Sequence, residues 1–335
     1  MNVLMLYGGR SAEREISKLS AEFVGDSLEA AGHRVLKVEI DAEGGWSLDG
    51  QPLTVLPASG RWRILRGEED VSFGMVFPVL HGPFGEDGTV QGLCETARWP
   101  YAGAGVAASS VCMDKVLFRR LMEAYGLPLV EWASYHRRNS ADALQEWSGR
   151  MPVFVKPARL GSSVGITRAA DAVGLKRALE VALGYDGKIL VERAVTGPRE
   201  IEVSVIGEDT GVSAAVPGEI LPGREWYDFQ AKYHCQESRL VIPAELDRRT
   251  TEELRNLACR AFACVDGRGF ARVDFLVSGS GRVFLNEINT IPGFTSISMF
   301  HRLWEAAGVP VARLMDRILA AGLNRPEAGL PEEVL

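Results

Sequence analysis

The sequence has few cysteines and no long hydrophobic run. Its five cysteines are scattered and form no Cys-X-X-Cys pair, so we expect reduced thiols in the interior rather than disulfides or a zinc site. No apolar stretch is long enough to cross a bilayer, and the first residues lack the basic flank of a signal peptide. These absences predict a cytoplasmic protein without a membrane partner.

Basic runs are also absent. The chain carries 37 Lys and Arg against 44 Asp and Glu, a formal net charge of −7, which argues against a general nucleic-acid binder. Any anionic ligand must therefore be held by local groups. Neither a Walker A loop nor a G-X-G-X-X-G fingerprint occurs, and the missing fingerprint weighs against a dinucleotide-dependent oxidoreductase.

Length and composition are those of an ordinary globular protein with more than one domain. The 335 residues are 46% apolar and 24% charged, and domains usually hold about 100–150 residues. No internal repeat and no low-complexity linker interrupts the chain. We place boundaries near Gly105 and Val195, which predicts domains over residues 1–105, 106–195 and 196–322 and a tail over 323–335.

The sequence predicts alternating strands and helices in the first domain. An apolar run over residues 3–7 ends at Gly8-Gly9, helical spacing follows to a capping Gly32, and strands resume over 35–40 and 71–80. This α/β pattern predicts a parallel sheet, with ligands bound beyond the carboxyl ends of its strands. Glu13, at the start of the helix, either complements the helix dipole or anchors a substrate ammonium. His81, at a strand end, is a core histidine, a polar contact or a general base.

The central part predicts one continuous helix and a compact strand–helix alternation. The helix starts at Ser109 or Ser110 and runs to Gly126, with Lys115 on it; a helical lysine is usually solvated. Strands over 151–157 and 188–195 enclose a helix over 171–183. Lys156 leads into the glycine-rich segment 161–165, which is either a plain turn or a loop whose N–H groups and hydroxyls contact phosphate.

The most informative segment is a predicted hairpin over residues 269–289. Closing it on Gly279-Ser280 places Arg272 opposite Glu287, and alternation then puts Arg272, Asp274, Glu287 and Asn289 on one face. That face is either a solvated ion pair or a site that holds Mg²⁺ against phosphate, because Mg²⁺ prefers oxygen ligands. A loop of hydroxyl side chains follows it, and the irregular stretch 221–239, rich in aromatic residues, is either a packed Ω-loop or a lid.

Taken in order, these motifs resemble the ATP-grasp enzymes, and specifically the D-alanine–D-alanine ligase family. The resemblance covers nearly the whole chain. It is carried by residues 8–15, 81–89, 113–115, 155–157, 161–165, 227–233 and 286–296. It implies an ATP-grasp fold in which a parallel α/β domain precedes two α+β domains that sandwich the nucleotide. It further implies ATP-dependent synthesis of D-alanyl-D-alanine for peptidoglycan precursors through an acyl phosphate.

The resemblance also implies a role for each matching residue. Glu13, with Ser162 and Tyr233, would bind the ammonium of the first D-alanine, and His81 would lie near its carboxylate. Arg272 and the Gly293 N–H would stabilise the oxyanion, and the second substrate's carboxylate would contact Ser298 and Met299. ATP would be held by Lys115, Lys156, Ser163, Glu192, Val195, Glu200 and Lys232. Asp274, Glu287 and Asn289 would ligate two Mg²⁺ or Mn²⁺ ions.

Alternatives stay open at this point. Tyr233 accompanies an amine nucleophile in this family, whereas Phe accompanies a hydroxy acid such as D-lactate, so another carboxylate ligase is the nearest alternative. A nucleotide-binding regulator without chemistry is a second, although Arg272 and the three predicted metal ligands argue against it. Phe229-Gln230 and Arg193-Ala194 depart from the usual family pairs, and the latter leaves adenine packing open. A homodimer is implied by the resemblance only.

Overall fold

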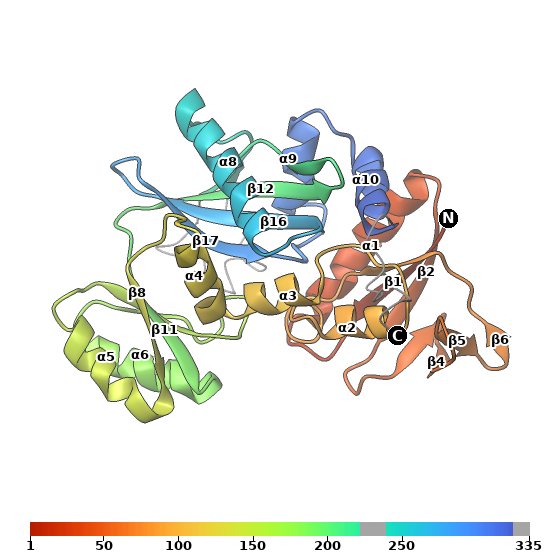
Figure 1. Cartoon of the computed structure of the whole chain (residues 1–335), viewed down its shortest axis with the longest axis horizontal. Coiled ribbons are helices and arrows are strands. Elements are labelled where there is room, and N and C mark those ends of the chain that lie inside the picture. The colour runs from red at the N-terminus through yellow and green to blue at the C-terminus, as the bar shows by residue number, and fades with distance from the viewer. Residues whose placement is uncertain (222–238, 324–335) are drawn as a thin grey trace, which may run out of the picture.

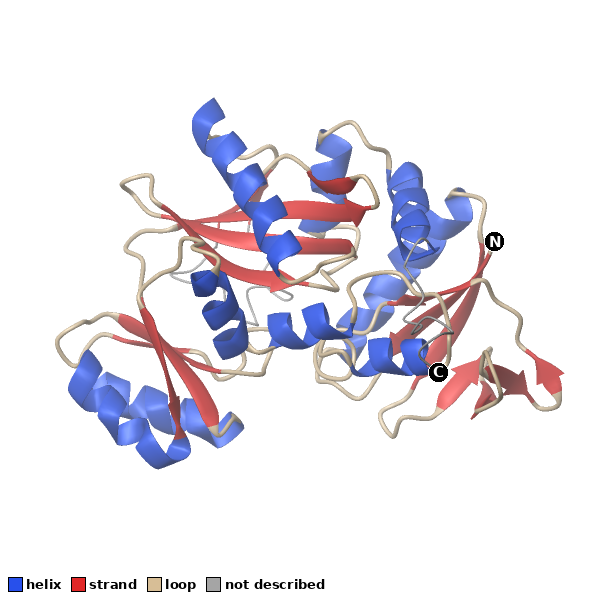
Figure 2. Cartoon of the chain, viewed as in Figure 1, coloured by secondary structure: helices blue, strands red, loops and turns tan. Residues whose placement is uncertain are grey.

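Three β-sheets follow one another along the chain in this computed structural model, each accompanied by helices (Figures 1 and 2). The structure describes residues 1–221 and 239–323. The predicted mixed α/β class is confirmed. Within those residues no helix is long and apolar enough to cross a membrane, and the four cysteines found there are free thiols, as predicted.

The first sheet is mixed rather than wholly parallel. Its strand order is β6-β5-β4-β3-β2-β1-β7, and only β2, β1 and β7 run parallel. Short glycine-containing turns join β2 through β6, and a short turn can connect only antiparallel neighbours. The strands are β1 (Asn2–Gly8), β2 (Arg34–Ile40), β3 (Trp46–Leu48), β4 (Gln51–Leu56), β5 (Arg63–Arg66), β6 (Glu69–Asp70) and β7 (Met75–Pro78).

Helix α1 (Arg14–Ala30) follows the glycine turn as predicted, and Gly32, at φ +84°, ends it. Helix α2 (Thr89–Thr96) follows the strand end that carries His81. The predicted single helix to Gly126 is wrong. It is two helices, α3 (Val106–Met113) and α4 (Lys115–Ala124), because Asp114 adopts extended backbone and its carboxylate accepts the N–H groups of the next turn. Lys115 thereby opens α4.

The second sheet is antiparallel, with the order β10-β9-β11-β8, and α5 and α6 cover it (Figure 1). Its strands are β8 (Trp132–His136), β9 (Val153–Pro157), β10 (Thr167–Ala169) and β11 (Lys188–Arg193), and its helices are η1 (Arg137–Asn139), α5 (Ser140–Trp147) and α6 (Ala172–Tyr185). The glycine-rich segment joins β9 to β10, so Lys156 and the loop lie at one end of this sheet.

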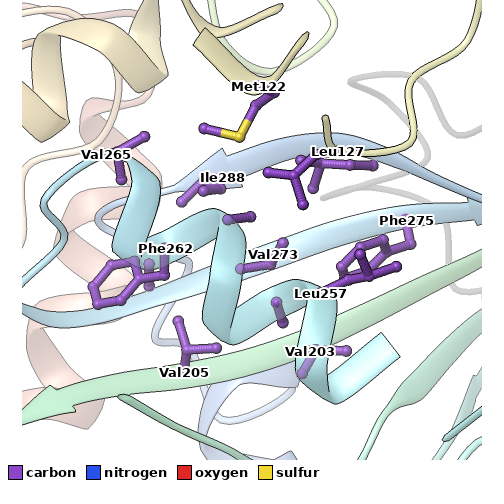
Figure 3. Packing of buried hydrophobic residues seen from close by; sticks show 14 of the residues in the cluster. Met122, Leu127, Val203, Val205, Leu257, Phe262, Val265, Val273, Phe275 and Ile288 are labelled. Atoms are coloured by element: carbon purple, nitrogen blue, oxygen red, sulfur yellow. The ribbon is translucent and has the colours of Figure 1, made fainter. Parts of the chain in front are cut away.

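The third sheet is antiparallel and carries the hairpin. Its main order is β15-β14-β12-β16-β17, with β13 beside β12. The strands are β12 (Arg199–Glu208), β13 (Gly211–Ala214), β14 (Gly218–Leu221), β15 (Arg239–Val241), β16 (Gly269–Val277) and β17 (Val283–Asn289). Helix α8 (Arg248–Cys264) crosses one face, where Phe262 packs beside strand residues, and Met122 of α4 joins the same core (Figure 3).

The first and third sheets share a second apolar core. Helices α9 (Met299–Ala306) and α10 (Val311–Leu323) contribute to it, and α10 packs against α1. The aromatic rings of Phe77, Phe270, Phe294 and Phe300 meet there with centroids 5.0–6.3 Å apart. Because Phe294 lies within the loop that follows β17, this core fixes that loop beside the ends of β1 and β7.

Candidate active site

All predicted site residues that the structure describes line one cavity of about 1520 Å³. Strands of the second and third sheets contribute to its wall, and the first part of the chain contributes α1 and the segment that follows β7. The lining includes Glu13, His81, Lys115, Lys156, Ser162, Ser163, Glu192, Val195, Glu200, Arg272, Asp274, Glu287, Asn289, Gly293, Ser298 and Met299. Tyr233 and Lys232 lie outside the described residues.

The predicted register of the hairpin is wrong, although the predicted face is right. Val277 pairs with Val283, and the Ser278 N–H donates to the Arg282 carbonyl, which closes a three-residue turn over 279–281 whose last residue, Gly281, has φ +81°. Further along, a bulge inserts Asn286, so Asp274 pairs with Glu287 and Arg272 with Asn289. The longer turn and the bulge each shift the register by one residue, and two such shifts restore the original face. Without the bulge, Glu287 would point into the core.

The face so formed is densely charged. Arg272 lies 2.7 and 2.8 Å from the two carboxylate oxygens of Asp274 and 3.1 Å from Glu202. Asn289 donates to Asp274 at 2.9 Å. Burial alone would lower the pKa of Arg272, but Asp274 and Glu202 outweigh it and hold that pKa well above its usual range. The side chains of Arg272 and Asp274 are only 16% and 14% exposed, so this is not the solvated ion pair considered as the alternative.

Glu13 meets the glycine-rich loop. The Ser162 hydroxyl donates to the Glu13 carboxylate, and Gly82, at φ +74°, lies against the same carboxylate. Ser162 and Ser163 both have left-handed backbone, at φ +50° and +59°. Two consecutive non-glycine residues in that region are strained, and such strain is concentrated at functional loops.

His81 is buried and both of its ring nitrogens are engaged. Nδ1 lies 3.1 Å from the Ile291 carbonyl and Nε2 lies 2.9 Å from the Ser20 hydroxyl. Burial lowers the pKa of His81 to about 4, so the ring is neutral at pH 7, with Nδ1–H donating to the carbonyl. This arrangement fits a residue that holds the loop after β17 in place, and it leaves no free nitrogen for a general base.

The two lysines lie on the side of the second sheet. The Lys156 ammonium is 2.5 Å from one oxygen of Glu192, and Arg119 is 2.7 Å from the other. Burial would raise the pKa of Glu192, but these two cations lower it to about 2. Lys115 donates to the Leu160 carbonyl at 2.6 Å and so reaches the glycine-rich loop. Both ammonium groups therefore line the wall of the cavity where that loop lies.

The loop after β17 supplies hydrogen-bonding groups at the start of α9. Ser298 precedes that helix, and its hydroxyl lies 2.9 Å from both the N–H and the hydroxyl of Thr295. A Cβ on Gly293 would lie 3.1 Å from the same hydroxyl. The turn is therefore tight, and Ser298 and Met299 at the start of α9 line the cavity.

Family models cover both halves of this architecture. Residues 2–104 match the model described as "D-ala D-ala ligase N-terminus", and residues 121–320 match "D-ala D-ala ligase C-terminus". The chain belongs to the D-alanine–D-alanine ligase family. It is 43% identical to the D-alanine--D-alanine ligase of Solibacter usitatus, over 97% of this chain and 96% of that protein. Identity to the D-alanine--D-alanine ligase of Heliobacterium modesticaldum is 42%, with 96% and 94% covered.

Solved structures agree with this assignment. The D-alanine-D-alanine ligase from Coxiella burnetii superposes with a TM-score of 0.88 at 33% identity, covering 97% of this chain and 94% of that one. The VanG D-Ala:D-Ser ligase from Enterococcus faecalis superposes with a TM-score of 0.87 at 29% identity, covering 96% and 99%. The predicted family and ATP-grasp fold are thereby confirmed.

D-alanine–D-alanine ligases typically use ATP and Mg²⁺, and the chemistry of the hairpin face fits such an ion. Asp274, Glu287 and Asn289 offer carboxylate and amide oxygens on one side of β16 and β17. Among residues 1–221 and 239–323, no group of three His, Cys, Asp or Glu is placed to hold a metal. Asp274, Glu287 and Asn289 are two carboxylates and one amide, so they do not count as a group of three His, Cys, Asp or Glu.

Sequence reasoning missed two buried residues: Glu86, which lines the cavity, and Arg119, which does not line it but contacts Glu192. Arg119 carries no motif, and its contacts are to residues far along the chain. Glu86 lies in the His81 motif but received no role. It accepts the Gly82 N–H at 2.6 Å, and burial together with Glu13 raises its pKa to about 8. The only available signal was its place in a glycine-rich turn that also holds His81.

Proposed function

We propose that the cavity binds ATP and two molecules of D-alanine together and joins the D-alanines through an acyl phosphate. The activity of a D-alanine–D-alanine ligase follows from the family. The observation that carries the site assignment is that the lysine pair, the Arg272–Asp274 face and the Glu13–Ser162 pair line a single cavity. The placement of each substrate in the cavity is our proposal.

The first D-alanine would place its ammonium at Glu13. The Glu13 carboxylate opens α1 beside Ser162 and supplies the negative charge that an ammonium needs. Tyr233 would complete this contact. His81 would act near the substrate carboxylate by holding the backbone at Ile291, which its ring contacts.

ATP would lie between the second and third sheets. Lys115, Lys156 and Ser163 surround the end of the cavity that suits phosphates, and Lys232 would join them. Glu192 and Val195 would face the adenine and Glu200 the ribose, because they line the cavity at and beyond the end of β11 and at the start of β12. The lysines would neutralise charge on the transferring phosphoryl group, which is much of what phosphoryl transfer requires.

Two Mg²⁺ or Mn²⁺ ions would be ligated by Asp274, Glu287 and Asn289, and they would polarise the γ-phosphate. Asp274 is now bonded to Arg272 and Asn289. The Asp274 carboxylate would therefore be shared between the metal and Arg272.

The chemistry would proceed in two displacements. A carboxylate oxygen of the first D-alanine attacks the γ-phosphorus, the bond to ADP breaks, and an acyl phosphate forms. The neutral amine of the second D-alanine then attacks the acyl carbon, phosphate leaves, and the amine loses a proton. Attack by the amine would give a tetrahedral intermediate, and Arg272 and the Gly293 N–H would stabilise its oxyanion before phosphate leaves. The start of α9, at Ser298 and Met299, would hold the carboxylate of the second D-alanine.

Other features of this proposal rest on the family likeness. A cytoplasmic location fits the need for ATP, and a homodimer is expected from the resemblance. The domain division at residues 105, 195 and 322 remains a proposal, since α4, assigned to the central domain, also packs against the core of the third sheet.

Transfer of ¹⁸O tests the acyl phosphate. D-Alanine labelled with ¹⁸O in its carboxylate should pass one ¹⁸O to inorganic phosphate for each dipeptide formed, because the labelled oxygen bridges carbon and phosphorus in the intermediate. Mass spectrometry of the phosphate measures the transfer. Dipeptide formation with unlabelled phosphate would overturn the proposed route.

Gly82→Ala should raise KM for the first D-alanine by at least ~10-fold, equivalent to about 1.4 kcal/mol of binding. A Cβ at residue 82 would lie 2.4 Å from a Glu13 carboxylate oxygen and would displace it. Steady-state kinetics would show little change in KM for ATP. Gly126→Ala is the matched control, because Gly126 has φ +66° but open space around its Cβ position. An unchanged KM for D-alanine would contradict the placement of Glu13.

Tyr233→Phe should raise the use of D-lactate relative to D-alanine as the second substrate at neutral pH. This expectation rests on the family correlation, since Tyr233 lies outside the described residues. Competition between the two acceptors, with products separated by mass, measures the ratio. D-Serine belongs in the same panel because a D-Ala:D-Ser ligase superposes closely on this chain. An unchanged D-lactate ratio would mean that Tyr233 does not select the nucleophile.

A further inference from the structure

Arg119 is a buried arginine that joins two parts of the site. It lies on α4, and its side chain and that of Glu192 are each only 3% exposed. Its Nη2 donates to Glu192 on β11 at 2.7 Å, and its Nη1 donates to the Leu285 carbonyl on β17 at 2.7 Å. One planar guanidinium therefore spans the second and third sheets.

The contact on β17 falls at the bulge. Leu285 immediately precedes the inserted Asn286, and Arg119 Nη2 lies 3.5 Å from the Asn286 side-chain oxygen. Strand β17 is at the edge of its sheet, and the Leu285 N–H on that strand is taken by the Pro128 carbonyl at 2.8 Å. Both backbone groups of Leu285 are thus satisfied by the α4 region. This gives the bulge a fixed place, and the bulge is what turns Glu287 toward Asp274.

The contact on β11 sets the charge around Lys156. Glu192 is shared between Lys156 and Arg119, so the three side chains together carry a net charge of +1. If Arg119 were neutral, Glu192 would cancel Lys156 and the trio would carry no net charge. The surroundings of the cavity would then carry one positive charge fewer, which weakens the attraction for a triphosphate.

We propose that Arg119 is a positioning residue for the reaction, in two separable ways. Its charge leaves Lys156 free to attract the phosphates of ATP, and its planar fork holds the β17 bulge so that Glu287 faces the metal. This inference rests on the proposed function of the cavity, because it assigns phosphates to Lys156 and a metal to Glu287.

Two substitutions separate the charge from the fork. Arg119→Lys keeps the charge but cannot bond Glu192 and the Leu285 carbonyl at once. Arg119→Met removes both. Arg317→Met is the matched control, because Arg317 bonds Glu208 at 2.9 and 2.7 Å and Ser213 at 2.9 Å, and neither partner lines the cavity, whereas Glu192 does.

Calorimetric titration with a non-hydrolysable ATP analogue provides a readout that does not depend on turnover. In EDTA, Arg119→Met should weaken analogue binding by on the order of 10-fold, whereas Arg119→Lys should stay within about 2-fold of the parent. When Mg²⁺ is titrated, both variants should need about 10-fold more Mg²⁺ to reach half of the metal-dependent gain in affinity. Arg317→Met should match the parent in both measurements.

Arg119→Lys tests the role of the fork even where Arg119→Met fails to fold. If Arg119→Lys is folded and its Mg²⁺ requirement equals that of the parent, the role of the fork is overturned. If folded Arg119→Met binds the analogue in EDTA as tightly as the parent, the role of the charge is overturned. A parent chain that binds the analogue but makes no dipeptide would instead contradict the proposed function. The two failures are therefore distinguishable.

Discussion

Glu287→Gln should lower turnover by at least ~10²-fold while the fold remains intact, the size of effect that loss of one charge-stabilising group produces at an active site. Glu287 reaches the hairpin face only through the bulge at Asn286 and pairs there with Asp274. Its removal takes a carboxylate from the proposed metal ligands without opening a cavity, since Gln has nearly the same shape. We would measure kcat at saturating ATP, D-alanine and Mg²⁺.

A matched control is available on the same sheet. Glu208 on β12 pairs with Arg317 and does not line the cavity, so Glu208→Gln should retain parental turnover. Circular dichroism and a thermal melt would show whether each variant is folded. A folded Glu287→Gln enzyme with near-normal turnover would contradict the assignment of this face to metal binding.

Arg272→Met is expected to reduce dipeptide formation by on the order of 10³-fold, because a cation aimed at a developing oxyanion is among the largest single contributions to catalysis. Arg272 is also the positive charge that balances Asp274 and Glu202 on a poorly exposed face. Arg272→Lys, which keeps the charge but not the planar fork, should fall between the parent and Arg272→Met.

The proposed role of Arg272 predicts which step suffers more. Positional isotope exchange within ATP reports the first phosphoryl transfer, whereas dipeptide release requires both steps. Isotope exchange should fall less than dipeptide formation in Arg272→Met if the guanidinium acts chiefly on the tetrahedral oxyanion. An equal loss in both assays would place Arg272 on the phosphoryl group instead.

Residues that bear chemistry at strand ends and glycine turns are predictable from the sequence, because local patterning alone sets where a strand stops and a loop begins. Glu13, His81 and Lys156 are of this kind, and all three line the cavity. Glu13 and His81 converge because they follow β1 and β7, parallel neighbours whose carboxyl ends meet at one edge of the first sheet. Lys156 lies on the second sheet, and its approach to them depends on how the sheets pack together.

The hairpin shows how a local rule can fail and still give the right face. A two-residue turn is the simplest closure for the Ser-Gly segment, but the structure uses three residues and then a bulge. The bulge depends on Arg119 and Pro128, which bond Leu285 from outside the sheet. No pattern within residues 269–289 carries that information.

Long-range contacts explain the remaining misses. Arg119 contacts Glu192 and Leu285, which are 73 and 166 positions away in the sequence. A helical arginine ordinarily lies in solvent. The break between α3 and α4 depends on Asp114, which caps α4 and pairs with Lys188 on β11. Helical periodicity continues across that break and therefore conceals it.

The central claim is that this chain joins two D-alanines at the expense of ATP, and one assay tests it most directly. The purified protein is given ATP, Mg²⁺ and either D-alanine or L-alanine, phosphate release is followed, and the products are identified by mass. We predict phosphate release with D-alanine and a product with the mass of D-alanyl-D-alanine, and neither with L-alanine. A protein that binds ATP yet releases no phosphate and forms no dipeptide with D-alanine would contradict the claim.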